Sequence, residues 1–275
     1  MHLNIIRLFL FVFLISCSSK DEQPFQSNFK SDIKLYSEGM NFLKKKEFEK
    51  ATETFTELEI QHPYSAWSVK GQLMSGFAHY KNNEYEEAIL TLSKFIELNP
   101  NHESIDYAMY LKAFCYYERM PDVNLDQNLS KRAYEGFSEL LNRFPKSKYS
   151  KKSLTHIQSL KNHLAAREVK VGKFYQSQGF YLAGIKRYKV VLAEYKKSTH
   201  IPESIFRIIE CYISMGLTKQ SLYLYKILQY NFPKSQWESE ARQLIIKNKL
   251  YKKLKKFKKK QLDLDKLSPA DFDLI

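Results

Sequence analysis

The feature that most constrains this chain is an internal repeat within its first hundred residues. A small residue, an aromatic residue, an alanine, a large apolar residue and a proline recur in the same order, each 37 residues further along. The first set and its copy are Gly39, Phe48, Ala51, Phe55, Pro63 and Gly76, Tyr85, Ala88, Leu92, Pro100. A period of this length indicates stacked supersecondary units, which have to be recognised before any other element is assigned.

Each of these residue types has a physical reason in a pair of antiparallel helices. The small residue on the first helix lets the second helix approach closely, and the alanine lies at that crossing, where a larger side chain would force the pair apart. The large apolar residues fill the space towards the next unit. The proline ends the second helix because it lacks an amide hydrogen and disfavours helix in its predecessor. These spacings match the tetratricopeptide pattern.

Three further units follow with a weaker pattern. The third has its first helix over residues 105–117, with Ala113 as the small residue, and eight extra residues predict a protruding loop over 119–128. We expect an additional helix over 150–167 before the fourth unit. The matching positions are Ala133, Phe137, Leu140 and Pro145 in the third unit, Phe174, Phe180, Ala183, Val190 and Tyr195 in the fourth, and Tyr212, Ser221, Tyr225, Leu228 and Pro233 in the fifth.

Composition agrees with an all-helical chain. Aromatic residues make up 15% of it, while there are only eight glycines and eight prolines, which disfavours disorder and turn-rich all-β designs. The predicted fold class is all-α, a tetratricopeptide-like superhelical solenoid of about five helix-turn-helix repeats over 33–240, followed by a basic helix. Its N-terminal repeats cover 33–149 and its C-terminal repeats cover 150–240. Stacking of such units creates a concave surface of the kind that binds other proteins.

The N-terminus has the pattern of an export signal. The apolar run Leu8–Ile15 is too short to span a bilayer, which takes about 20 residues, but it fits a secretory signal peptide over 1–16. Leu14-Ile15-Ser16-Cys17 resembles the bacterial lipobox, which implies that Cys17 carries lipid and that 17–32 is a flexible tether. Ser18 stands where an aspartate would resemble the inner-membrane retention signal, so we expect outer-membrane sorting. An ordinary signal peptide with an incidental cysteine is the alternative.

Positive charge is concentrated near the other end. The formal net charge is +14, and nine lysines without any acid lie between Lys247 and Lys260, so removing them leaves +5 (14 − 9). Ile246, Leu250, Leu254 and Phe257 are helically spaced, which predicts a basic amphipathic helix over 241–262 that binds anionic headgroups or an acidic helix. A nucleic-acid partner does not suit an exported chain. The acidic segment 263–275 is expected to be a flexible tail.

Patterns that carry catalysis were sought and not found. The sequence has no glycine-rich phosphate loop, HExxH, GxSxG or paired-cysteine metal pattern. Cys115 and Cys211 lie in apolar stretches, and we expect them to be buried and to behave as small hydrophobic residues. We expect Ser104 and the acids near it to begin a helix. We therefore expect no enzyme, no catalytic residue, no metal site and no cofactor beyond the lipid on Cys17.

Several contiguous segments resemble the BamD family, the lipoprotein subunits of the outer-membrane β-barrel assembly (BAM) complex. The resemblance covers about residues 33–240 and the lipobox, and its most specific part is 99–195. Ser221 in place of alanine, Tyr195 in place of proline and the lysine-rich segment depart from the family pattern. The segments are Asn99-Pro100-Asn101-His102, Asp106-Tyr107-Ala108-Met109-Tyr110, Phe144-Pro145-Lys146-Ser147-Lys148-Tyr149, Leu164-Ala165-Ala166-Arg167-Glu168, Phe174-Tyr175 and Ala183-Gly184-Ile185-Lys186-Arg187-Tyr188.

The resemblance implies a periplasmic scaffold, lipid-anchored to the inner leaflet of the outer membrane. Its C-terminal repeats would dock the periplasmic (POTRA) domains of the barrel insertase, and its N-terminal repeats would bind unfolded outer-membrane proteins. Other lipoproteins of the BAM complex are further expected partners. An anchor beside the membrane raises the effective concentration of these partners without new contacts.

Two groups of residues are candidates for these contacts. Four aromatic residues of the N-terminal half are expected to line a groove for an apolar substrate segment, because rings are frequent interface anchors; the alternative is that they pack between repeats. Three cations near 187 are candidates for docking the insertase, the alternative being a solvated helix face. The groups are Tyr36, Tyr64, Trp67, Tyr80 and Lys186, Arg187, Lys189.

Two other functions remain open at this point. A cell-envelope repeat lipoprotein that organises peptidoglycan synthesis or division would share the same fold and anchor. A lipid-anchored envelope hydrolase would need a site built wholly from dispersed residues.

Overall fold

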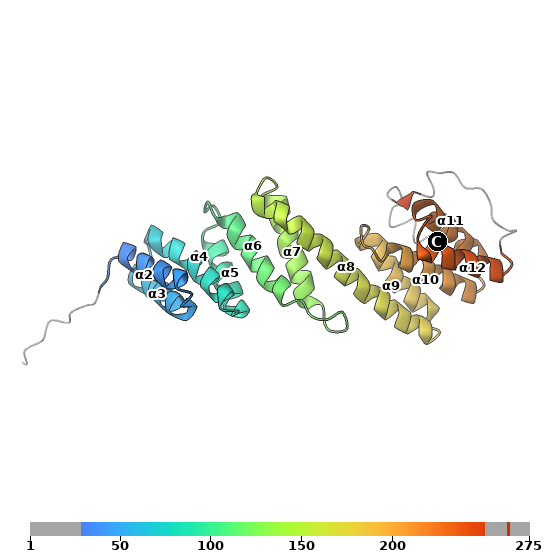
Figure 1. Cartoon of the computed structure of the whole chain (residues 1–275), viewed down its shortest axis with the longest axis horizontal. Helices are drawn as coiled ribbons and strands as arrows, with labels where there is room; N and C mark the ends of the chain where they lie inside the picture. Colours follow the sequence, from blue (N-terminus) through green and yellow to red (C-terminus); the bar gives the residue numbers. More distant parts are fainter. Residues whose placement is uncertain (1–28, 251–262, 265–275) are drawn as a thin grey trace, which may run out of the picture.

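The computed structural model describes residues 29–250 and 263–264, and in these residues it contains helices and no strands. Five helix pairs and a closing helix follow one another along the long axis in chain order (Figure 1). The predicted all-α, tetratricopeptide-like solenoid is therefore confirmed. The pairs are α2 (Asp32–Lys44) with α3 (Phe48–Gln61), α4 (Ala66–Lys81) with α5 (Tyr85–Leu98), α6 (Ile105–Glu118) with α7 (Asn128–Arg143), α8 (Lys148–Ser177) with α9 (Tyr181–Glu194), and α10 (Ile201–Ser214) with α11 (Thr218–Asn231), followed by α12 (Gln236–Lys247).

The turn inside four of the five pairs has the same backbone conformation. One residue with a left-handed φ stands two positions before the second helix of the first, second, fourth and fifth units. These residues are Lys46 (φ 62), Asn83 (φ 61), Gly179 (φ 79) and Gly216 (φ 76). The third unit replaces this turn with its longer loop, so the repeat can be followed in the backbone as well as in the side chains.

The small residues of the pattern lie where the paired helices cross. A Cβ atom built on Gly39 would lie 2.5 Å from the Phe55 ring, and one on Gly76 would lie 2.8 Å from Leu92. A Cβ on Gly172 would collide with the Tyr188 ring in the same way. Because no side chain fits at these points, the large residue of the second helix packs directly on the backbone of the first.

This contact corrects the predicted register of the fourth unit. Ala183 and Val190 were expected at the crossing, but both are only half-buried, and Phe180 is exposed. Gly184 and Tyr188, at the spacing from Gly172 that Ala51 and Phe55 have from Gly39, are buried instead. Glycine is favoured at 184 because a Cβ there would lie 3.1 Å from the Gly172 carbonyl oxygen. An alanine at 184 would fit only if the two helices moved slightly apart.

The expected separate helix over 150–167 is also corrected. It is the first half of α8, a single helix of 30 residues that continues to Ser177. No proline or left-handed residue interrupts it. Gly172 lies within the helix, and the absence of a side chain there makes room for the Tyr188 ring. As a result, α8 contributes Ile157 and Leu160 to one core and Leu164 and Val169 to the next.

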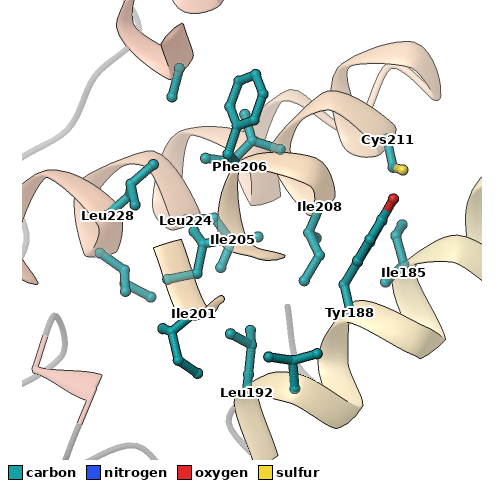
Figure 2. Packing of buried hydrophobic residues seen from close by; sticks show 14 of the residues in the cluster. Ile185, Tyr188, Leu192, Ile201, Ile205, Phe206, Ile208, Cys211, Leu224 and Leu228 are labelled. Atoms are coloured by element: carbon teal, nitrogen blue, oxygen red, sulfur yellow. The ribbon is translucent and has the colours of Figure 1, made fainter. Parts of the chain in front are cut away.

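The interior is a series of cores between neighbouring helices. Three smaller clusters occupy the spaces among α2–α4, α4–α6 and α6–α8, and one large cluster runs from the second half of α8 to α12. In the large cluster the Tyr188 ring lies beside Ile185 and points towards Cys211 (Figure 2). Cys115 and Cys211 are both buried, as predicted, and burial raises the pKa of each thiol to about 12.

The ends of the chain differ from the expected boundaries. The limit placed at 240/241 falls inside α12, which stops at Lys247 because Lys249 adopts a left-handed φ of 57°. Ile246 and Leu250 are therefore not on one continuous helix. Leu250 and Leu264 both pack against the C-terminal core, and the Leu264 amide donates to Asn231 Oδ1 at 3.3 Å. The predicted signal peptide, Cys17, the rest of the basic helix and most of the tail lie outside the described residues.

Candidate interaction surface

The first helices of the units form the inner side of the solenoid. Each first helix contacts the first helix of the next unit, from α2 through α4, α6 and α8 to α10, and α10 also contacts the closing helix α12. The second helices have at most marginal contact with one another. Helices on the inside of a curve lie closer together than those on the outside. Side chains left half-buried on the first helices are therefore the candidates for binding along the concave surface.

One such set of rings crosses three consecutive first helices. We call Tyr80, Tyr107, Tyr110, Phe114 and Tyr149 the aromatic face; all five are half-buried. Ring centroids are 5.9 Å apart for Tyr80–Phe114, 5.7 Å for Tyr110–Phe114, 5.4 Å for Tyr110–Tyr149 and 5.1 Å for Tyr107–Tyr149. The face thus runs without a break from α4 across α6 to α8.

His156 lies under the centre of this face. Its ring is stacked on Phe137 at 5.1 Å and lies 5.2 Å from Phe114, and its Nε2 is 3.3 Å from the Tyr110 hydroxyl. Burial lowers the pKa of His156, which favours the neutral ring. The centre of the aromatic face is therefore an uncharged, ring-lined surface near neutral pH.

Lysines stand at both ends of the aromatic face. The Lys81 ammonium is 5.8 Å from the centre of the Tyr80 ring, and those of Lys148 and Lys152 are 5.0 and 5.8 Å from the Tyr149 ring. Cations near ring faces gain from the ring quadrupole. The arrangement suits an extended polypeptide that has apolar or aromatic side chains and some negative charge.

The structure separates the four predicted groove residues. Tyr36 and Trp67 contact each other with centroids 4.9 Å apart and pack on the N-terminal core. Tyr80 belongs to the aromatic face, and Tyr64 is fully exposed in the α3–α4 turn. Of the four, the structure brings together only Tyr36 and Trp67.

The predicted docking cations lie on α9. Lys186 and Arg187 are exposed and Lys189 is half-buried. Arg187 Nη1 is 3.3 Å from Glu168 Oε2 on α8, so this guanidinium is already partly neutralised within the chain. Arg167, next to Glu168 in sequence, points elsewhere and donates to the Val123 and Asn124 carbonyls. These two neighbours therefore contact separate partners.

Sequence reasoning missed most of the aromatic face. Tyr107, Tyr110, Phe114 and Tyr117 follow one another at intervals of three and four residues on α6, which places them on one side of that helix. That stripe was a usable signal. What the spacing did not indicate is that Tyr149, 35 residues beyond Phe114, packs against Tyr107 and Tyr110 of the same stripe.

In 29–250 and 263–264, no three His, Cys, Asp or Glu side chains are grouped so that they could hold a metal ion. None of the helices in this part of the chain combines the length and apolar character needed to cross a bilayer.

Comparison with known proteins gives the family. Residues 29–227 match the YfiO family model, described as outer membrane lipoprotein. Outer membrane protein assembly factor BamD of Caulobacter vibrioides is 36% identical over 85% of this chain and 77% of its own length, and that of Rickettsia prowazekii is 35% identical over 77% and 84%. A solved complex of the yeast Sti1 TPR2AB domain with pHSP90 aligns with a TM-score of 0.43 at 15% identity, over 78% of this chain and 84% of that chain. The family match and these two bacterial relatives place the chain in the YfiO family of outer membrane lipoproteins, which includes the BamD assembly factors.

Proposed function

We propose that this chain is an outer membrane protein assembly factor that acts as a binding scaffold. The observation that carries the proposal is the similarity to BamD proteins over most of the chain, at 36% and 35% identity in two bacteria. The stacked helix pairs support a scaffold, because proteins of this architecture use an extended concave surface to hold other chains. Catalysis has no part in the proposal.

The N-terminal half is proposed to bind unfolded outer-membrane proteins along the aromatic face. Strands of such barrels alternate apolar and polar residues and carry aromatic girdles, so their side chains suit a surface of half-buried rings. The lysines at its ends favour segments with acidic residues or a free carboxylate. Tyr36 and Trp67, whose ring centroids are 4.9 Å apart, offer a second, smaller contact nearer the N-terminus.

The C-terminal half is proposed to dock the periplasmic POTRA domains of the barrel insertase, with other lipoproteins of the complex as further partners. Lys186 and Arg187 on α9 support this role because both are exposed. Rim charges of this kind mainly steer association and set its orientation. An acid on the partner would compete with Glu168 for Arg187.

The chain is proposed to be held at the periplasmic side of the outer membrane by lipid on Cys17. The lipobox-like Leu14-Ile15-Ser16-Cys17 supports this anchor, as does the description of its family as outer membrane lipoprotein. One acyl chain alone binds a membrane only marginally, so stable anchoring implies more than one chain on Cys17.

The test depletes the chain in its own host and complements it with variants. Tyr110→Leu/Phe114→Leu removes two rings while keeping apolar volume, and Tyr230→Leu, an exposed ring on α11, is the matched control. We expect the double variant to fold, shown by a cooperative thermal transition above the growth temperature of the host, and to lower the level of outer-membrane barrels, while Tyr230→Leu complements fully.

Two outcomes contradict parts of the proposal separately. Normal barrel levels with the double variant would remove the aromatic face from substrate binding. A wild-type chain that co-purifies in mild detergent with cell-wall enzymes, and with no barrel insertase, would replace the assembly role with the organisation of peptidoglycan synthesis or division.

A further inference from the structure

A cleft opens beside the third unit, away from the aromatic face. It lies between α5 and α7, which flank α6 in the chain order of Figure 1, and has a volume of about 400 Å³. Its floor includes Met109 and Ala113, both buried, and Ile96, which is half-buried. Tyr116, Arg132 and Glu135 are among the residues around it.

The cleft opens where the third unit departs from the repeat. The residue just before the large apolar residue of the second helix has a side chain in the other four units: Thr54, Thr91, Arg187 and Leu224. In the third unit this residue is Gly136, which lines the cleft. A Cβ there would lie 3.0 Å from the Ala113 Cβ, so the Ala113 methyl group disfavours a side chain at 136.

The second unit has the reverse arrangement. It carries Gly76 on the first helix and Thr91 on the second, whereas the third carries Ala113 and Gly136. The same fold therefore accommodates both combinations. Exchanging one for the other would fill the cleft with a side chain that a neighbouring unit already carries.

The polar groups of the cleft include two without a partner among the described residues. Lys112 is half-buried and Glu135 is exposed, and neither forms an ion pair or hydrogen bond within 29–250 and 263–264. The other charged groups are engaged: Arg132 Nε donates to Asn128, and Glu139 pairs with Arg143 at 3.0 Å. The Lys112 ammonium is therefore available to donate to a carboxylate from outside the chain.

We propose that this cleft binds a short segment of a partner protein, which inserts one apolar side chain over Met109 and Ala113 and places an adjacent carboxylate on Lys112. The volume suits one or two side chains and excludes a folded domain. Glu135 at the rim accepts a basic residue of the same segment. The site is distinct from the aromatic face, so it stands or falls independently of substrate binding there.

The first experiment places a photo-activated benzoylphenylalanine at 135 in the full chain, in its native envelope. The control carries it at 90, the same repeat position in the second unit, where Leu90 is 73% exposed. We expect an adduct from 135 and none from 90. The cross-linked partner peptide, sequenced by mass spectrometry, should contain an apolar residue next to an acid.

The second experiment fills the cleft with Ala113→Gly/Gly136→Thr. We expect this variant to keep its thermal transition, to lose the adduct from 135, and to bind a synthetic copy of the cross-linked peptide about tenfold or more weakly, because the burial of one apolar side chain is lost. Lys112→Glu should weaken the same peptide similarly, and changing its acid to lysine should restore binding to that variant.

Several results would overturn the proposal. The probe at 135 could give no adduct, or an adduct only with lipid or with this chain itself. The cross-linked partner segment could lack an apolar residue next to an acid, or the adduct could persist in the variant with the filled cleft. Suppose that depletion of the chain stops barrel assembly but residue 135 gives no adduct. That result would exclude the cleft as a binding site and leave the assembly role intact.

Discussion

At the scale of single residues, the solenoid depends on glycines inside helices. Glycine in a helix interior ordinarily costs about 1 kcal/mol relative to alanine, so a glycine retained there needs a compensating contact. Gly172 has one, because the Tyr188 ring packs where its Cβ would be, and the Tyr188 hydroxyl donates to Gln176 Oε1 at 2.7 Å.

We therefore predict that Gly172→Ala destabilises the chain, although propensity alone would make it stabilising. The clash with Tyr188 should cost about 1–3 kcal/mol, as overpacking of a filled core does. Denaturant unfolding measures it. Gly172→Ala/Tyr188→Leu should recover part of the loss, and a single variant as stable as the original chain would contradict the packing described.

Glu203 is a second residue whose neighbours matter. Its side chain lies 3.7 Å from His200 Nδ1, 3.5 Å from Lys173 Nζ and 3.7 Å from Arg207 Nε. The nearby His200 ring and the cations Lys173 and Arg207 lower the pKa of this carboxyl below its usual 4.5. A lowered carboxyl pKa contributes stability above the unfolded value, and the contribution is lost as pH falls through the folded value.

Glu203→Gln should accordingly destabilise the chain at pH 7, by about 1 kcal/mol after solvent screening. The difference from the original chain should shrink as pH falls below about 4.5, because protonation then neutralises the native carboxylate as well. Thermal unfolding between pH 7 and pH 3 tests this, and Glu97→Gln, at an exposed residue of α5, is the control. A difference that stays constant over this range would contradict the assigned role.

At the scale of elements, α8 joins the two halves and holds the loop of the third unit. The loop predicted over 119–128 is bound to α8 through its backbone. Arg167 donates to the Val123 and Asn124 carbonyls at 3.3 and 3.2 Å, and Lys170 contacts the Asn124 side chain. Inside the loop, Gln127 donates to the Asp122 and Leu125 carbonyls at 2.9 and 3.0 Å.

Arg167→Ala should release this loop from α8 while leaving the helix formed. Amide hydrogen exchange at 121–126 is expected to become about tenfold faster, since hydrogen bonds to a charged group contribute about 1.5–3 kcal/mol and tenfold corresponds to about 1.4 kcal/mol. Lys151→Ala, exposed on the same helix, is the control. Unchanged exchange in the loop would show that packing, and not Arg167, holds it.

At the scale of the whole molecule, separate cores follow one another along the chain, and no core spans its length. Stability in such an array is approximately a sum of unit and interface terms. The α8 helix departs from this picture because its two halves belong to different cores. It carries Tyr149 of the aromatic face near its start, and through Glu168 it pairs with Arg187 of α9.

The proposed membrane anchor also concerns the whole molecule. We predict that Cys17→Ala moves the chain from the membrane fraction to the soluble fraction of the envelope, because the lipid would be lost. Fractionation measures this, and mass spectrometry of the mature N-terminus identifies the lipid. Cys115→Ala, at a buried thiol, should remain with the membrane, and an unacylated N-terminus on the unaltered chain would refute the anchor.

The sequence by itself determined the fold class, the approximate number of units and the first helix of the third unit, predicted over 105–117 and found at Ile105–Glu118. Those features depend on local relationships: a small residue at a crossing, a large one four residues after the alanine, and a proline after the second helix. Even so, the fourth unit was assigned out of register. Ala183 matched the pattern by type, while Gly184 was the residue that the contact with Gly172 required.

Only the tertiary structure decided which surfaces the units present. Helical spacing shows that Tyr107 and Tyr110 share one side of α6, but it does not show that Tyr149 of α8 packs against both rings. In the same way, Gly136 is an ordinary helix glycine until its position beside Ala113 and Lys112 makes it part of a cleft. Spacing fixes neighbours along one helix, whereas a binding surface depends on which helices pack together and how closely they approach.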